Sequence, residues 1–562
     1  MTIKLRLLSL VTFLFLKIGF SQDAKVTITS SDLSETSFLE RTEFKVSYSG
    51  SIFWNNGINL GAEYLFKEYT KVKNRKRGLR TNTHQFLLNG TLGFTTNFST
   101  KTDTGIFTNY GITWRRTNKK GKQFSIAINP LGYYRSFLPE TYKVTGDNVE
   151  KVFLPGRGYY APSLTIGIGK QRLVKNTGRF FNITSCYAHH IMQAPCLLLI
   201  FSMATVLTLK RKKNMQKIIK NCSKVIVLII TLCTVFSCSN DIDFNNLNDT
   251  IFVRHRNADM PAYIHGNGSE KVFLIILHGG PGGIGLSYRS STIKSDIEKE
   301  CAVVYFDQRG SGMAQGSYSE SGISIDIMAE DILALVKVIK HKYGNDSRFF
   351  LMGHSWGGTL GPATLLKDQS DFLGWIDVDG AHNTQGMYLE YIANFNRVAL
   401  EQIEAENDIA YWESVLNLIN TIAPEYNLDD VQRLNSEAFE AEAVLHDAGL
   451  INSEAGGGDN IIFNYTPLTI LWNMQNTQSI LDSDLFQNIN FQDRLSEITI
   501  PSLVLWGRHD MVVPIKFAQD SYDNLGSIEK ELVFFENSGH SPMSTEPDLF
   551  AEKVIEFINQ NK

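Results

Sequence analysis

Cysteine is scarce in this 562-residue sequence, and its distribution argues against disulfide or metal chemistry. Five of the six cysteines lie between residues 186 and 238, so Cys301 stands alone in the C-terminal half. Such spacing supplies neither a disulfide framework nor a CxxC metal site, and we expect no metal and no other cofactor. The net charge is only −4, and the one basic run, residues 71–80, is typical of a solvated loop. We therefore expect no nucleic-acid partner.

Charge is absent from a stretch near the N-terminus, inside residues 1–21. Lys4 and Arg6 precede the uncharged apolar run Leu7 to Leu16, and small residues come after it. This order is typical of a secretory signal peptide. We therefore expect export, with a buried N-terminal helix as the alternative.

Residues 22–172 are rich in segments that alternate polar with apolar or aromatic residues. Examples are Gln85–Phe94, Gly105–Trp114 and Ser163–Ile168, and charged or glycine-containing turns separate such segments. A period of two residues predicts β-strands. We expect an all-β, barrel-like segment, either a small barrel in an outer membrane or a soluble β-sandwich, since both produce this pattern.

A second uncharged stretch lies in the middle of the chain, within residues 173–249. Ile191 to Leu209 contains 19 residues without a charge, which is long enough to cross a bilayer as a helix. The basic run Lys210 to Lys213 ends it, and a further apolar run, Val225 to Phe236, follows. We expect the region to serve as a linker that targets the chain to a membrane.

The residues around Cys238 leave two hypotheses open. The tetrapeptide VFSC (235–238), with polar residues after it, resembles the lipobox of bacterial lipoproteins, and Met215 begins a segment like a new N-terminus. In the first hypothesis two adjacent genes have been joined, and the C-terminal protein is lipidated at Cys238. In the second, the two apolar runs form a transmembrane hairpin with a cytoplasmic basic link. Both predict a membrane-anchored protein of the cell envelope with its C-terminal part outside the cytoplasm.

Residues 250–562 alternate short apolar runs with helical stretches, which is the pattern of a mostly parallel sheet with helices on both faces. We assign this part to the α/β class and expect it to complete a core without the preceding segments. Its functional residues are expected in the loops that follow the strands. The predicted strands are Val272–Leu277, Ala302–Phe306, Phe349–Met352, Leu373–Val378, Leu503–Trp506 and Leu532–Phe535.

The sequence GHSWGG (353–358) stands directly after one of these strands and before a helical stretch. A G-x-S-x-G turn between strand and helix lifts its serine above the sheet, because the glycines avoid clashes that a Cβ would cause. Ser355 is therefore predicted to be a nucleophile. The following helix supplies the N–H of Trp356 to a developing oxyanion, and the loop HGGPGG (278–283) supplies those of Gly279 and Gly280.

A serine nucleophile needs a base that is held in place by a third group. When the nucleophile stands in such a turn, the acid and then the histidine follow it along the chain. Asp510 and His540 stand just after the last two predicted strands. We predict a triad of Ser355, Asp510 and His540, with Asp379 and His509 as competing assignments.

Together HGGPGG, DQRGSG (307–312), GHSWGG, GRHD (507–510) and SGH (538–540) resemble the prolyl iminopeptidase family of α/β-hydrolases, over about residues 272–562. The resemblance implies an α/β-hydrolase fold and an enzyme that removes N-terminal residues, often proline, from peptides. His354 departs from the family, which commonly has glycine before the serine, whereas esterases and lipases commonly have histidine. A carboxylesterase or lipase with the same triad is therefore the alternative, and its substrate would be a small ester or amide.

Residues 381–495 form a predicted helical insertion that corresponds to the cap of such enzymes. In the resembling family, cap carboxylates hold the free amine of the substrate, which makes Glu390, Glu401, Glu404 and Glu413 candidates here. A hypothesis of another class makes the chain a membrane-associated β-barrel or binding protein whose hydrolase is accessory.

Overall fold

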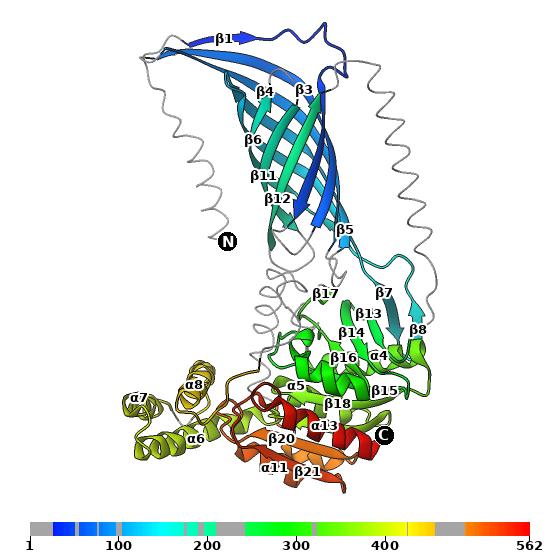
Figure 1. Ribbon diagram of the computed structural model, residues 1–562, viewed down its shortest axis with the longest axis vertical. Helices are drawn as coiled ribbons and strands as arrows, with labels where there is room; N and C mark the ends of the chain where they lie inside the picture. The colour runs from blue at the N-terminus through cyan, green and yellow to red at the C-terminus, as the bar shows by residue number, and fades with distance from the viewer. Residues whose placement is uncertain are drawn as a thin grey trace.

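The computed structural model describes residues 26–50, 56–75, 78–96, 104–172, 177–188, 196–208, 242–316, 323–423, 425–455 and 489–562. Two sheets dominate these residues (Figure 1). We call the first sheet the β-rich part, and residues 242–562 the C-terminal part. The predicted signal peptide, residues 1–21, and the predicted lipidation site, Cys238, lie outside the described residues.

The β-rich part is an antiparallel, barrel-like sheet, as the alternating sequence predicts. Its pairings run β2-β3-β4-β5-β6-β10-β11-β12 and return from β12 to β2, while β1 pairs with β3 and β9 with β6. The strands are β1 (Val26–Ser30), β2 (Thr42–Gly50), β3 (Asn56–Arg75), β4 (Gly78–Thr96), β5 (Thr104–Asn118), β6 (Lys122–Phe137), β9 (Gly158–Tyr160), β10 (Ser163–Arg172), β11 (Thr177–Ala188) and β12 (Cys196–Thr208).

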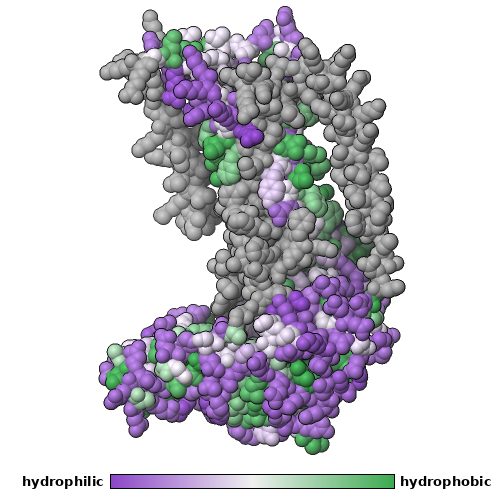
Figure 2. All heavy atoms as spheres, viewed as in Figure 1, coloured by the Kyte–Doolittle hydropathy of each residue, from purple (hydrophilic) through white to green (hydrophobic). Residues whose placement is uncertain are grey.

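Along much of these strands apolar side chains point outward and polar ones inward, although Leu87 and Phe107 are buried. In β3, Ile58 and Leu60 are 64% and 59% exposed, whereas Asn59 between them is 5% exposed. The same alternation exposes Phe44, Val46, Tyr48, Leu88, Leu92, Phe94, Ile106, Tyr110, Ile112, Ile128, Leu164, Ile166 and Ile168. Inside, Arg115 pairs with Glu43 and Glu63, and Lys45 pairs with Glu63. Figure 2 shows green, hydrophobic residues on this part, whereas the visible surface of the C-terminal part is mostly purple.

The β-rich part extends beyond residue 172, where composition placed its end. Strand β12 occupies much of the uncharged stretch that we expected to cross a membrane, and it pairs with β11 and β2. Length and apolarity alone do not distinguish a helix from a strand, so the sequence pattern was ambiguous here. Among the described residues, no helix is both long and apolar enough to cross a membrane.

The C-terminal part has a mostly parallel central sheet with the strand order β21-β20-β19-β18-β15-β16-β14-β13, and β17 pairs with β14. The six strands predicted from the sequence are present, and an antiparallel pair, β13 and β14, precedes them. The bounds are β13 (Leu247–His255), β14 (Ala258–Gly266), β15 (Val272–Leu277), β16 (Ala302–Phe306), β17 (Gln315–Gly316), β18 (Arg348–His354), β19 (Phe372–Val378), β20 (Ser502–Gly507) and β21 (Lys530–Phe535).

Helices cover both faces of this sheet, which confirms the predicted α/β class. Alternate residues of β15 enter two separate cores, Ile275 on the face of α4 and α5 and Leu274 on the face of α13. The α-helices are α3 (Glu298–Glu300), α4 (Ile325–Tyr343), α5 (Trp356–Leu365), α6 (Thr384–Glu404), α7 (Ile409–Ile419), α8 (Leu428–Asp447), α11 (Lys516–Asn524), α12 (Pro542–Thr545) and α13 (Pro547–Asn561); shorter helical turns span Gly285–Tyr288, Ile293–Ile297 and Gln492–Glu497. Helices α6, α7 and α8 lie within the predicted cap and extend to one side of the sheet (Figure 1).

A hairpin from the first half of the chain joins the second sheet. Strands β7 (Glu140–Thr145) and β8 (Asn148–Lys151) follow β6, and β7 pairs in parallel with β13 at the sheet edge. Figure 1 shows β7 and β8 next to β13, below the barrel-like strands. Composition places residues 140–151 in the β-rich segment, so this pairing is not predictable from the sequence pattern.

Candidate active site

Ser355 stands at the turn between β18 and α5, as the G-x-S-x-G sequence predicts. Its backbone has φ 56° and ψ −118°, a region that non-glycine residues rarely occupy. The adjacent glycines permit this turn, because a Cβ at Gly353 would lie 2.2 Å from the carbonyl oxygen of Gly357. A Cβ at Gly357 would lie 2.1 Å from the carbonyl oxygen of Leu277 in β15. The strained turn therefore depends on close packing between α5 and the central strands.

Asp510 and His540, from the loops after β20 and β21, form a direct hydrogen bond. The Nδ1 atom of His540 lies 2.9 Å from Oδ2 of Asp510. The other carboxylate oxygen of Asp510 accepts hydrogen bonds from the backbone N–H groups of Val512 and Val513, both at 2.8 Å. Both side chains are buried. This arrangement fixes the His540 ring and stabilises a positive charge on it.

His354 connects the nucleophile turn to the loop of His540. Its Nε2 donates to the carbonyl oxygen of His540 at 2.6 Å, and its Nδ1 lies 2.6 Å from Oη of Tyr288. Burial and the nearby His540 lower the pKa of His354 to about 3, so its ring is neutral at pH 7. Since Nε2 is the donor, Nδ1 accepts the Tyr288 hydroxyl proton. His354 is thus a structural link and carries no free proton for catalysis.

Of the oxyanion donors predicted from the sequence, Gly279 lies against Ser355, but its N–H is already engaged. The N–H of Gly279 donates to Oη of Tyr288 at 2.8 Å. A Cβ at Gly279 would lie 3.2 Å from Cβ of Ser355, which places the glycine-rich loop against Ser355. Nε1 of the Trp356 side chain donates a hydrogen bond to Oε1 of Gln308 at 2.9 Å. Of the three predicted donors, this leaves the N–H groups of Gly280 and Trp356 as the candidates.

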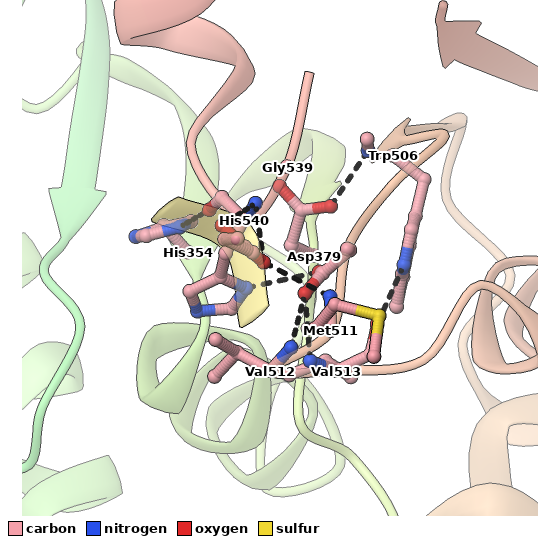
Figure 3. Close-up of polar contacts among 12 residues, drawn as sticks. His354, Asp379, Trp506, Met511, Val512, Val513, Gly539 and His540 are labelled. Atoms are coloured by element: carbon pink, nitrogen blue, oxygen red, sulfur yellow. Dashed lines mark hydrogen bonds and ion pairs between the residues drawn. The ribbon is translucent and has the colours of Figure 1, made fainter. Parts of the chain in front are cut away.

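Two further carboxyl groups lie beside His540 and Asp510: Asp379, which the sequence offered as a competing acid, and Glu442, which sequence reasoning missed. Oδ1 of Asp379, at the end of β19, accepts the N–H of Gly507 at 2.9 Å. Side-chain atoms of Asp379, His354 and His540 all lie within 4.8 Å of one another. Figure 3 shows these three residues converging at the site. Its position directly after a strand makes Asp379 a competing acid in the sequence, and the structure places its carboxyl group near His540.

Glu442, from cap helix α8, is the second of these carboxyl groups. Its oxygens accept the backbone N–H of His540 at 3.1 and 3.0 Å and the N–H of Met511 at 2.9 Å. Burial raises the pKa of Glu442, while His540 and these amides oppose the shift. The carboxylate therefore bridges the two loops that carry the acid and the base. No local motif marks it, because its partners lie about 70 to 100 residues away in the sequence.

The four cap glutamates proposed from the sequence occupy more exposed positions. Glu401, Glu404 and Glu413 are exposed, and Glu401 pairs with Arg397 at 3.0 Å. Glu390 is half-buried, and desolvation raises its pKa. His509, the competing base, lies next to Asp510 in the chain, but the histidine that contacts the Asp510 carboxylate is His540.

Comparisons with known proteins match this half of the chain. Residues 274–553 match the model of the alpha/beta hydrolase family. The probable aminopeptidase YbaC of Bacillus subtilis is 25% identical over 311 residues, which are 53% of this chain and 92% of the relative. A proline iminopeptidase of Saccharolobus solfataricus is 28% identical over 291 residues, which are 51% of this chain and 84% of the relative. The crystal structure of a Mycobacterium smegmatis proline iminopeptidase aligns with a TM-score of 0.38 and 17% identity, covering 56% of this chain and 98% of that one.

Proposed function

The C-terminal part of the chain belongs to the alpha/beta hydrolase family, and we propose that it is a serine hydrolase that acts through an acyl-enzyme on Ser355. The observation that carries the proposal is the buried hydrogen bond between Asp510 and His540 at the same end of the sheet as the strained Ser355 turn. Such a turn exposes a nucleophile, and such a pair supplies its base.

The reaction follows from these positions. Nε2 of His540 takes the proton of the Ser355 hydroxyl while Oγ attacks the substrate carbonyl carbon. Asp510 stabilises the imidazolium that forms, and the N–H groups of Gly280 and Trp356 stabilise the negative oxygen. His540 then gives its proton to the leaving amine or alcohol. Water attacks the acyl-enzyme with His540 again as base, which releases the acid and restores Ser355.

Replacement of Ser355 tests this proposal directly. Ser355→Ala should lower the turnover of any substrate by at least about 10³-fold, the scale of a triad nucleophile deletion, with the fold retained. Circular dichroism checks the fold, and a fluorophosphonate probe checks the nucleophile. A folded variant that still accepts the probe would show that another residue is the nucleophile.

For the substrate class, we propose an aminopeptidase that recognises a free N-terminus. The free amine of an N-terminal residue is separated from the scissile carbonyl carbon only by one Cα. A carboxylate that binds this ammonium must therefore lie near the triad. Glu442 meets this condition, whereas exposed Glu401, Glu404 and Glu413 fit it less well. The names of the two relatives, a probable aminopeptidase and a proline iminopeptidase, support the same class.

Matched substrates distinguish this proposal from the esterase alternative. Prolyl and alanyl anilides, free and N-acetylated, should be compared with p-nitrophenyl butyrate on one enzyme preparation. An aminopeptidase should cleave the free anilides, and acetylation should nearly abolish turnover, because a buried ion pair that loses one partner costs several kcal/mol. Rapid cleavage of the butyrate without anilide activity would leave the esterase, in keeping with His354.

Glu442→Gln tests which cap carboxylate meets the ammonium, with Glu401→Gln as the exposed control. We expect Glu442→Gln to lose anilide turnover and to keep butyrate turnover, since an ester without an amine does not need the charge. Loss of both activities would mean that Glu442 only holds the His540 loop. Loss of anilide turnover in Glu401→Gln would contradict the assignment.

For the β-rich part, we propose a location in a membrane, which is the second function candidate. The observation that favours it is the inverted polarity of the strands, with apolar side chains outward and an ion-pair cluster inside. Lipid matches the outward face, and water or polar groups match the interior. The same location would anchor the hydrolase at the cell envelope.

Lysine on the outward face tests the membrane proposal. Ile166→Lys should reduce the fraction of the chain that floats with phosphatidylcholine vesicles, since a lysine at the middle of a bilayer costs about 2–4 kcal/mol on a membrane barrel. Ile528→Lys, at a position 98% exposed in the C-terminal part, is the control and should change nothing. Equal flotation of both variants would favour a soluble sheet.

A further inference from the structure

Strand β13 lies where the sheet of the C-terminal part would otherwise end. Ile251, Phe252 and Val253 in this strand are fully buried, and one edge of the strand is already paired with β14. A long apolar edge strand with unpaired N–H and C=O groups invites association with another strand. Something must therefore cover the second edge of β13.

The hairpin of β7 and β8 covers that edge. Five residue pairs connect β7 to β13 in parallel, from Glu140 opposite Ile251 to Val144 opposite His255. The hairpin is compact by itself, because Thr145 pairs with Asn148 across a two-residue turn and Gly146 takes a positive φ of 60°. Since about 100 residues separate β7 from β13, their pairing resembles the docking of a peptide strand on a sheet.

Side chains of the hairpin enter the core of the C-terminal part. Tyr142 and Val144 are 5% and 6% exposed and belong to the hydrophobic cluster of α4 and β13. The Tyr142 ring lies edge-on to His341 of α4, with ring centroids 5.5 Å apart. Lys143, between the two, points to solvent. The alternation places one apolar face of β7 on the C-terminal part.

Charged residues of α4 hold the hairpin at both ends. Lys342 pairs with Glu140 at the start of β7 and with Asp249 of β13 at 3.0 Å. Lys337 pairs with Asp147 in the turn at 2.7 Å and donates to the carbonyl oxygen of Gly146 at 3.0 Å. These contacts specify the position of the hairpin, whereas the apolar face supplies burial.

A second contact lies beyond the hairpin. Nε of Arg157, just before β9, lies 2.6 Å from Oδ2 of Asp259, whose side chain is fully buried in β14. Arg254 pairs with the other oxygen of the same carboxylate at 2.5 Å. The β-rich part thus supplies one of two cations to a buried carboxylate. Removal of that cation would leave Asp259 with a weaker set of partners.

We propose that the edge of β13 is a docking site for the β7–β8 hairpin, and that this contact holds the β-rich part on the hydrolase even when the connecting chain is cut. The occupant is therefore a segment of this chain, and the covered edge keeps two hydrolase domains from pairing through β13. The proposal concerns an interface and is independent of the reaction at Ser355.

The test uses the full chain with a specific protease site inserted after Lys213 and an affinity tag at the C-terminus. After cleavage in detergent, the N-terminal fragment should stay with the tagged fragment during capture. Val144→Asp, which buries a charge in the docking face, should release it, and so should Val144→Asp combined with Arg157→Ala. Lys143→Ala, on the exposed face of the same strand, is the control and should retain it.

Hydrogen exchange on the uncut chain provides a second measurement that does not depend on capture. Amides of Ile251 to His255 should exchange slowly in the unaltered chain and about tenfold faster or more in Val144→Asp, with Lys143→Ala unchanged. Separation of the fragments in the unaltered chain, or the same retention and exchange in Val144→Asp as in Lys143→Ala, would overturn the proposal. So would cross-linking of β13 to β13 between two copies.

Discussion

Asp379 and Asp510 face each other beside His540, and the two buried carboxyl groups have different partners. Asp510 accepts two backbone N–H groups and the His540 ring, whereas Asp379 accepts one N–H through Oδ1. Desolvation and the adjacent Asp510 raise the pKa of Asp379 well above its usual range. Oδ2 of Asp379 is buried and accepts no hydrogen bond. The raised pKa favours the protonated form of Asp379, whose proton would be donated toward Asp510.

Amide substitutions separate the roles of the two acids. Asp510→Asn should lower kcat by about 10⁴-fold, as expected when the group that orients the base is lost. Asp379→Asn should keep most activity, because an amide N–H can replace the acid proton. Asp377→Asn, a buried neighbour bonded to Ser521, is the control. Greater loss in Asp379→Asn than in Asp510→Asn would make Asp379 the acid of the triad.

The pH dependence of kcat/KM depends on the charge states of His540 and of the carboxyl groups beside it. Burial lowers the pKa of His540 below 6.5, and negative charge on Asp379 or Glu442 would raise it. The base must be neutral, so activity should fall as the pH drops through the folded-state pKa, below pH 6.5. If Asp379 is neutral, Asp379→Asn leaves this acidic limb in place. A limb that moves to clearly lower pH in the variant would show that Asp379 carries a charge.

The turn between β18 and α5 is the element on which the site depends. Gly357 lies in the first turn of α5. A Cβ at this position would lie 2.1 Å from the carbonyl oxygen of Leu277 in β15, which is too close for a side chain. Gly357→Ala should therefore push α5 away from the sheet and displace Ser355. We expect a loss of about 1–3 kcal/mol in the free energy of unfolding, as for overpacked cores, and slow fluorophosphonate labelling. Gly449→Ala is the control. Gly449 has open space around it but a φ of +77°, so the substitution should lower the free energy of unfolding and leave the rate of fluorophosphonate labelling unchanged.

The described residues form two separate sheets, and the second takes its edge hairpin, β7 and β8, from the first half of the chain, so the hydrolase is less independent than its sequence pattern indicates. A fragment of residues 242–562 still contains the triad and most of both cores, and it should label with fluorophosphonate. Without Tyr142 and Val144 it loses apolar burial, so its Tm should fall by several degrees relative to the same domain in the full chain, on the scale of about 1 kcal/mol or more. Equal Tm values would mean that the hairpin adds no stability.

Anchoring is also a property of the whole molecule, and Cys238 provides its test. If the hydrolase is a lipoprotein, translation that starts at Met215 should yield a species with acyl mass on Cys238, and Cys238→Ala should abolish it. Intact-mass measurement of the product from the natural host provides the readout. Absence of acyl mass on Cys238 in the unaltered protein would contradict the lipoprotein hypothesis.

The sequence by itself determined the features whose causes are local. The strands of the C-terminal part follow from short apolar runs, and the Ser355 turn follows from glycines at fixed spacing around one serine. Asp510 and His540 could be predicted to lie together because functional loops follow strands, and that rule needs no knowledge of distant contacts. The alternating polarity of the β-rich part is likewise a period of two along each strand.

Only the tertiary structure decided the contacts between residues far apart in the chain. Glu442 contacts His540 from a cap helix, and β7 pairs with β13 although about 100 residues separate them. No local sequence pattern predicts either contact. The apolar run that contains β12 was compatible with helix or strand, and its pairing with β11 and β2 settled the choice. These contacts depend on which surfaces meet when the chain folds. Burial and hydrogen bonding stabilise contacts between residues that are close in space, whatever their separation in sequence.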